Sequence, residues 1–115
     1  MAQFLKEYWP FVLVIFWFIY KWWRAKQVKS QLPKLKSAGA TLVDVRSIAE
    51  FAHANAAGTL NIPLSELGHR LSEIPQDKPV VVCCASGSRS GMAKLLLLKN
   101  GYRNVHNIGN WSNLA

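Results

Sequence analysis

The stretch VVVCCASGSRSGMAKLLLLKN, residues 80–100, predicts the fold of this chain. It opens with five apolar residues, 80–84, as expected for a central strand buried on both faces of a parallel sheet. Small polar residues follow, and the segment 91–100 has the composition of a helix, which Gly101 ends as a left-handed cap. A buried strand, a short loop and a helix are typical of α/β proteins, in which strands and helices alternate.

The flanking sequence supplies the other elements of such a fold. Apolar and β-branched runs predict strands at 40–45, 59–62 and about 105–108. Ser47 can cap a short helix that runs to about residue 53, and Ser65 can cap a helix that runs to residue 74. Together these ranges predict a small parallel sheet flanked by helices.

The chemistry of the chain is concentrated around Cys84, at the end of the predicted central strand. Open parallel sheets bind ligands at the carboxyl ends of their strands. A loop of small residues can point several backbone N–H groups inward, and the helix that follows adds partial positive charge. A cysteine in this position is expected to be a nucleophilic thiolate, with Arg89 as a cation for an anionic substrate. A buried structural cysteine before an ordinary turn is the alternative.

These features resemble a known family. Residues 80–110, VVVCCASGSRSGMAKLLLLKNGYRNVHNIGN, resemble the catalytic half of a single-domain rhodanese, a thiosulfate:acceptor sulfurtransferase. The shared pattern is a hydrophobic strand, Cys-x-x-Gly-x-Arg-Ser, a helix, then Gly-Tyr and Asn-Val. LVDVR at 42–46, Glu50-Phe51 and Asn61-Ile62-Pro63 extend the resemblance to about residues 38–111. It implies a rhodanese-like α/β fold.

The resemblance also implies a role for each loop residue. Cys84 would carry a persulfide, and Arg89 would help to bind the donor. Asp44, Arg46 and Ser90 would support the loop. The donor would be a small thiosulfate-like anion and the acceptor cyanide or a thiol, including one on a protein, and no cofactor or metal is implied. The outer sulfur would be cradled by the backbone N–H groups of Ala85, Ser86, Gly87, Ser88 and Arg89.

Two alternatives to a sulfurtransferase stay open. The loop from Cys84 to Arg89 is one residue shorter than the loop of the related cell-cycle phosphatases, which favours sulfur over phosphate or arsenate chemistry. Many relatives carry Arg or Lys where this chain has Ala85, so the loop holds one cation. A membrane-tethered sulfur carrier or docking module with low turnover is therefore the main alternative.

The remaining cysteine and the histidines are interpreted as structural. Adjacent strand residues point to opposite faces, so Cys83 is expected in the core, not as a redox partner of Cys84. Two cysteines make no disulfide framework, which agrees with a reducing compartment. The spacing of His53, His69 and His106 does not suggest metal ligands.

The N-terminal part of the chain is built differently. Residues 1–36 carry seven basic side chains and one acidic one, whereas residues 37–115 carry seven and five. Ten of the thirteen aromatic residues precede residue 24, and no charge lies between Tyr8 and Tyr20. Residues 4–23 are long enough to cross a bilayer, with aromatic residues at both ends. A cleaved signal peptide, an interfacial helix and a buried core helix are the alternatives.

The expected organisation is a transmembrane anchor at 1–25, a basic juxtamembrane linker at 26–37 and a rhodanese-like domain at 38–115. Pro33 is expected to break or restart the helix, and the basic linker to contact lipid. The basic flank after the span places the domain in the cytoplasm, beneath a bacterial inner membrane. Nucleic-acid binding is excluded because no groove-reading motif is present and the domain is nearly neutral.

Overall fold

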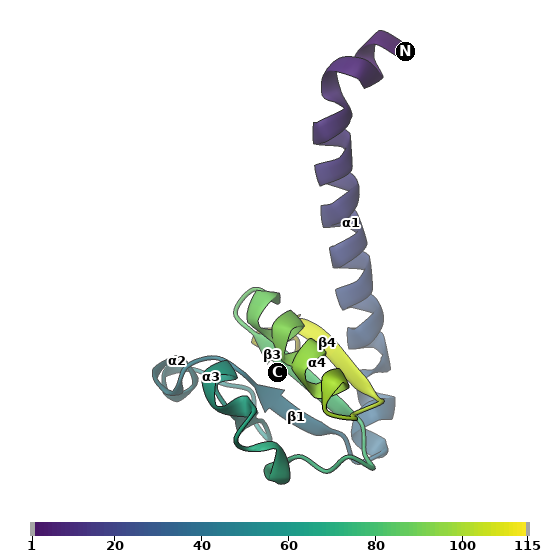
Figure 1. The fold of residues 1–115 in the computed structure, drawn as a ribbon. Coiled ribbons are helices and arrows are strands. Elements are labelled where there is room, and N and C mark those ends of the chain that lie inside the picture. The colour runs from purple at the N-terminus through teal and green to yellow at the C-terminus, as the bar shows by residue number, and fades with distance from the viewer. Residues whose placement is uncertain (1, 115) are drawn as a thin grey trace.

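The computed structural model describes residues 2–114 and contains a four-stranded parallel sheet with helices on both faces (Figure 1). The strand order is β2-β1-β3-β4. The central strand β3 pairs with β1 and β4, and all five of its residues are buried. The prediction of a small parallel sheet flanked by helices is confirmed. The strands are β1 (Thr41–Asp44), β2 (Leu60–Asn61), β3 (Val80–Cys84) and β4 (Val105–Asn110).

The helices agree with the sequence in type but not at every boundary. Ser47 caps α2 through a capping box with Glu50, as the sequence predicts. The predicted helix at 65–74 is wrong in its extent, because the chain forms only the single turn α3 and then a 3-10 turn. Pro63, with φ fixed near its preferred value, precedes the first residue of α3, so Ser65 is inside the turn and is not its cap. The helical elements are α1 (Ala2–Ser37), α2 (Ile48–His53), α3 (Leu64–Leu67) and α4 (Ser88–Lys99), with 3-10 turns at Leu71–Glu73 and Trp111–Leu114.

The sheet separates two hydrophobic clusters. On one face, Cys84 and Val82 of β3 pack with Leu97 of α4 and Leu67 of α3. On the other face, Cys83 and the neighbouring strand residues pack against the C-terminal half of α1 and the last 3-10 turn. The alternation of side chains along β3 therefore assigns its two cysteines to different cores.

The expectation that Pro33 breaks the first helix is wrong. α1 continues through Pro33 to Ser37, and the segment 26–37 that was predicted as a linker belongs to it. An interior proline costs about 3 kcal/mol of helix stability. Leu32 is buried in the cluster between α1 and the sheet, and Val28 and Leu35 pack against that cluster. Apolar burial on both sides of Pro33 therefore offsets the cost of the proline. The division of the chain into anchor, linker and domain stays a prediction.

The N-terminal part of α1 extends away from the sheet (Figure 1). Its large apolar side chains are exposed, from Phe4, 57% exposed, to Trp23, 47% exposed. The helix is long and apolar enough to cross a membrane, and the most apolar 18-residue window has none of its residues buried. The C-terminal half of the same helix is part of the domain core.

Candidate active site

Cys84 is the last residue of the central strand, where its chain turns into the loop before α4. Its side chain is fully buried and belongs to the cluster beneath α4. The loop is short, since α4 begins at Ser88, three residues earlier than the sequence suggested. The sulfur therefore lies at the carboxyl edge of the sheet and beside the first turn of a helix, as predicted.

The loop bends back on the sulfur through Gly87. This residue has φ +97°, a left-handed conformation that favours glycine, and its N–H donates to Cys84 Sγ at 2.8 Å. Ser90 Oγ lies 3.3 Å from the same sulfur. The sulfur thus has two hydrogen-bonding neighbours, the backbone N–H of Gly87 and the side-chain hydroxyl of Ser90.

The pKa of Cys84 is lowered from its ordinary value. Burial is the largest single influence on this pKa, and by itself it would raise the pKa, because it disfavours the thiolate. The hydroxyl of Ser90 and the backbone N–H groups of Ser90, Gly87 and Ser86 stabilise the thiolate, and together they outweigh burial. A buried cysteine with a lowered pKa has the character of a nucleophile.

Two asparagines from β4 fix the loop from outside. Asn107 Oδ1 lies 2.6 Å from Ser90 Oγ and shares with Cys84 Sγ the one proton of that hydroxyl, and Asn107 Nδ2 donates to the carbonyl oxygen of Gly87 at 3.3 Å. Asn110 Nδ2 donates to the carbonyl oxygen of Ala85 at 2.7 Å. These contacts hold the carbonyls of Ala85 and Gly87 on the side of β4, while the N–H of Gly87 points to the sulfur.

Arg89 is occupied by an acidic partner. Its guanidinium donates to both carboxylate oxygens of Glu50, at 2.7 and 3.0 Å, and these bonds lower the pKa of Glu50 to about 2. Glu50 also accepts from the backbone N–H and hydroxyl of Ser47 in the α2 capping box. The cation of the loop is therefore linked to α2 and partly neutralised there.

Asp44 and Arg46 form a buried pair at the end of β1. Arg46 Nη2 lies 2.7 Å from Asp44 Oδ2 and also donates to the carbonyl oxygen of Ala54 at 2.7 Å. The guanidinium carbon lies 4.8 Å from the centroid of the Trp111 ring. The pair ties β1 to the end of α2 and to the last 3-10 turn.

Cys83 has the opposite character from its neighbour. Its side chain is fully buried on the α1 side of the sheet, and both cysteines are free thiols. Burial, and then the negative charge of Asp44, raise the pKa of Cys83 to about 12. The thiol form dominates at neutral pH, so Cys83 lacks the reactivity of Cys84.

Sequence reasoning brought the loop, Asp44, Arg46 and Ser90 to one edge of the sheet but missed other contributors. Asn107 and Asn110 were not singled out, although carboxamides are uncommon in strands and two of them in the final strand are a usable signal. No local sequence pattern indicated the ion pair between Glu50 and Arg89, which are 39 residues apart. Within residues 2–114, no three side chains of His, Cys, Asp or Glu are arranged to hold a metal ion.

The sequence matches the family model of the rhodanese-like domain over residues 25–112. Among curated proteins, it is 45% identical to the uncharacterized protein YqhL of Bacillus subtilis over 69 residues, 60% of this chain and 55% of that one. It is 42% identical to a sulfurtransferase of Allochromatium vinosum over 67 residues, 58% of this chain and 63% of that one. The matched segment thus spans less than two thirds of these relatives' own length.

Solved structures of sulfurtransferases and rhodaneses are similar to this chain over most of their own length. The human single-domain sulfurtransferase TSTD1 is 33% identical, with a TM-score of 0.61 over 73% of this chain and 88% of that one. A rhodanese with anions from E. coli is 32% identical, with a TM-score of 0.62 over 66% of this chain and 92% of that one. The likeness extends over most of both solved chains.

Proposed function

This chain belongs to the rhodanese-like domain family, and on that premise we propose that it is a membrane-anchored sulfurtransferase that works through a persulfide on Cys84. The sulfurtransferases among its relatives support sulfur transfer as the reaction class. The thiosulfate-like donor and the thiol or cyanide acceptor are part of the proposal.

The observation that carries the proposal is the pair of contacts on Cys84 Sγ. Gly87 N–H at 2.8 Å and Ser90 Oγ at 3.3 Å stabilise a buried thiolate, with its pKa lowered. The same loop N–H groups can stabilise the charge of an outer sulfur without rearrangement. A six-residue loop around one sulfur has little room for a tetrahedral phosphate, which supports sulfur over phosphate or arsenate chemistry.

The reaction has two balanced steps. The Cys84 thiolate attacks the outer sulfur of thiosulfate, an S–S bond forms to Cys84, and the S–S bond of the donor breaks to release sulfite. A cyanide ion or a thiolate then attacks the outer sulfur of the persulfide. The new bond takes that sulfur away as thiocyanate or as a persulfide, and Cys84 leaves as a thiolate.

We propose further that α1 anchors the chain in a membrane. The exposed apolar side chains between Phe4 and Trp23 and the absence of charge between Tyr8 and Tyr20 support a span there. The basic residues that follow support a cytoplasmic domain and contact with lipid headgroups. Retention in the membrane after alkaline carbonate extraction, with the domain digested by protease in inverted but not in right-side-out vesicles, is the expected outcome.

A sulfur carrier with low turnover is the second candidate, and one observation favours it. Arg89 is paired with Glu50, so the loop cation expected to bind the donor is partly neutralised. A carrier would accept sulfur at Cys84 and release it slowly to small acceptors. Steady-state thiocyanate formation separates the two, because an enzyme turns over many times and a carrier does so only slowly.

Mass spectrometry of the full chain tests the persulfide itself. Incubation with thiosulfate is expected to add the mass of one sulfur atom to Cys84, and added cyanide to remove it. Cys84→Ser is expected to abolish the addition, while Cys83→Ala, on the other face of the sheet, is the matched control and is expected to retain it. Sulfur loading that persists in Cys84→Ser would overturn the proposal.

A further inference from the structure

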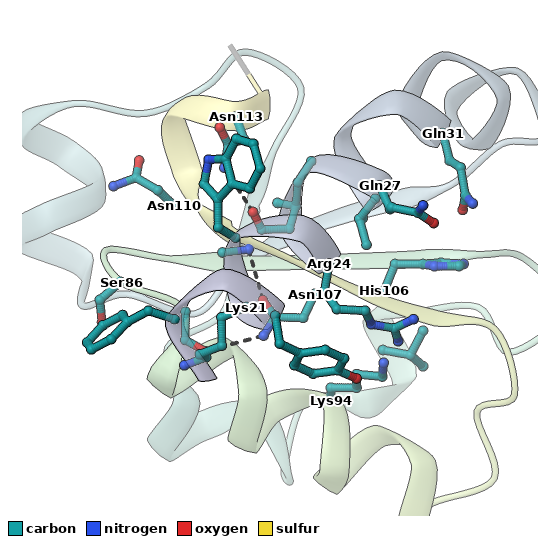
Figure 2. A pocket seen from close by; sticks show the side chains of 18 of the residues that line it. Lys21, Arg24, Gln27, Gln31, Ser86, Lys94, His106, Asn107, Asn110 and Asn113 are labelled. Atoms are coloured by element: carbon teal, nitrogen blue, oxygen red, sulfur yellow. Dashed lines mark hydrogen bonds between the residues drawn. The ribbon is translucent and has the colours of Figure 1, made fainter. Parts of the chain in front are cut away.

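A groove of about 670 Å³ runs between α1 and the free edge of the sheet at β4 (Figure 2). Its volume falls within the range of about 300–1,000 Å³ that is usual for small-molecule sites. One wall is α1, where Trp17 to Trp22 belong to the proposed membrane span and Arg24 to Gln31 follow it. The other wall is β4 with Lys94 of α4. The groove is thus made jointly by the domain and by the helix that precedes it.

One end of the groove adjoins the loop of Cys84. Ser86 and Gly87 line this end, and Gly87 is the residue whose N–H contacts Cys84 Sγ. Asn107, which also lines the groove, is hydrogen-bonded to Ser90, the other partner of the sulfur. The groove therefore shares Gly87 with the loop around the nucleophile, although Cys84 itself does not line it.

The other end of the groove is positively charged. Arg24 of α1, Lys94 of α4 and His106 of β4 meet there (Figure 2), and both cations lower the pKa of His106, after burial, which lowers it most. Lys21 adds a further cation along the α1 wall. No acidic side chain lies among the residues that line the groove. Lys21, Arg24 and Lys94 have no salt-bridge partner among residues 2–114. A cleft lined by charges of one sign raises the local concentration of ligands of the opposite sign.

The two ends are well separated. Lys94 is six residues beyond Ser88, so at about 1.5 Å per residue it lies roughly 9 Å along α4 from the loop. A compact anion such as thiosulfate cannot contact the cationic end and the loop at once. The ligand that uses both ends is long, with its negative charge at one end and its reactive atom at the other.

We propose that this groove binds the sulfur acceptor, a thiol on a long flexible arm that ends in a phosphate or carboxylate. The anionic end would bind Arg24, Lys94 and His106, and the arm would reach past Ser86 to the mouth of the loop. This inference rests on the proposed function and names its acceptor class. The thiolate attacks the outer sulfur of the Cys84 persulfide, the S–S bond to Cys84 breaks, and the products are the acceptor persulfide and the Cys84 thiolate.

The site can be tested with two thiols that differ only in one phosphate, pantetheine and 4′-phosphopantetheine. The full chain is placed in nanodiscs of phosphatidylcholine, and binding of each thiol to the unloaded protein is measured by calorimetry. The rate of sulfur removal from the thiosulfate-loaded protein is then measured with each thiol. The phosphorylated thiol is expected to bind at least about fivefold more tightly, as one or two partly exposed charge contacts allow, and to remove sulfur faster.

Substitutions assign that preference to the groove. Lys94→Gln and Arg24→Gln are expected to remove most of the preference while leaving the rate with pantetheine unchanged. Lys99→Gln, at the exposed end of α4 and outside the groove, is the matched control and is expected to keep it. Both substitutions in the groove replace exposed or half-buried side chains, so loss of the preference without loss of pantetheine turnover separates charge recognition from misfolding.

Three results would overturn the inference. Equal affinity for the two thiols would show that the groove does not select a terminal anion. A preference that survives Lys94→Gln and Arg24→Gln would assign the selection to another part of the chain. A preference that disappears when phosphatidylglycerol replaces phosphatidylcholine would assign the groove to a lipid headgroup. Calorimetry uses the unloaded protein, so a failure of persulfide formation would count against the proposed function and not against the groove.

Discussion

Arg89 and Glu50, 39 residues apart in the chain, are joined by two hydrogen bonds of 2.7 and 3.0 Å beside the loop of Cys84. In the proposed reaction, the carboxylate would compete with an anionic donor for this guanidinium. Since the same carboxylate completes the capping box of α2, the strength of this competition depends on an element outside the loop. If Arg89 binds the donor as proposed, donor affinity is expected to depend in part on α2.

Glu50→Gln tests this competition. The substitution keeps the size of the side chain but removes its charge, so Arg89 becomes available to thiosulfate, and the KM for thiosulfate is expected to fall several-fold. Steady-state kinetics of thiocyanate formation measures the change. Glu73→Gln, in an exposed pair with Arg70, is the control and is expected to leave KM unchanged. An increase in KM on Glu50→Gln would mean that the pair orients Arg89 for donor binding.

Ser90→Ala is expected to make Cys84 a weaker acid. The Ser90 hydroxyl favours the thiolate, so its removal raises the pKa of Cys84, and the thiolate fraction at a given pH below that pKa falls. The acidic limb of the pH profile for alkylation by iodoacetamide should therefore move to higher pH. Ser86→Ala is the matched control, because its hydroxyl bonds Ser88 and not the sulfur. An unshifted profile in Ser90→Ala would assign the lowered pKa to the backbone alone.

Gly87→Ala is expected to impair sulfur loading more than its effect on stability explains. A left-handed conformation costs an L-residue about 1–2 kcal/mol, and a Cβ at Gly87 would also lie 3.4 Å from Gly109 Cα. The contact at 3.4 Å is an ordinary van der Waals distance, so the strain comes from the backbone, and its relief moves the N–H away from Cys84 Sγ. Gly58→Ala bears the same backbone cost at φ +77° with no atom within 4 Å, and is expected to load normally. Equal loading rates in the two variants would argue against a role for the Gly87 N–H.

The sequence predicted the parts of this site that depend on local pattern. The apolar run of β3 and the alternation of its side chains placed Cys84 and Cys83 on opposite faces, and the small residues after Cys84 predicted a tight turn into a helix. The start of α4 was set too late, because Ser88 and Ser90 are as common in loops as in a first helical turn.

Long-range features were not predictable from the sequence. The contact of Arg89 with Glu50 depends on where α2 lies relative to α4, and no local pattern encodes this. The groove depends on the angle at which α1 crosses the edge of the sheet. α1 packs on the sheet through Leu32, which lies beside Pro33, where the sequence predicted a break.

Asp44→Asn is expected to destabilise the domain by about 3 kcal/mol, since removing one partner of a buried ion pair leaves the other charge uncompensated. Asp44 is fully buried and Arg46 is 4% exposed, so water cannot replace the lost charge. Urea unfolding of the full chain in detergent measures the change. Glu73→Gln is expected to leave the transition where it is, because its pair with Arg70 is on the surface. Equal transitions for the two variants would show that the buried pair adds nothing beyond a surface pair.

Leu32→Ala tests whether α1, the proposed anchor, is also part of the domain. Leu32 is 7% exposed and packs with Leu42 and Ile108, so its truncation is expected to cost about 3 kcal/mol. Leu13→Ala, 57% exposed in the same helix, is expected to leave the stability of the domain unchanged. In a Cys84→Ser background, alkylation of Cys83 across a urea series reports unfolding, because this thiol is fully buried beneath α1. Equal transitions in the two variants would mean that α1 does not hold the sheet, and the groove that it forms with β4 would lose its structural basis.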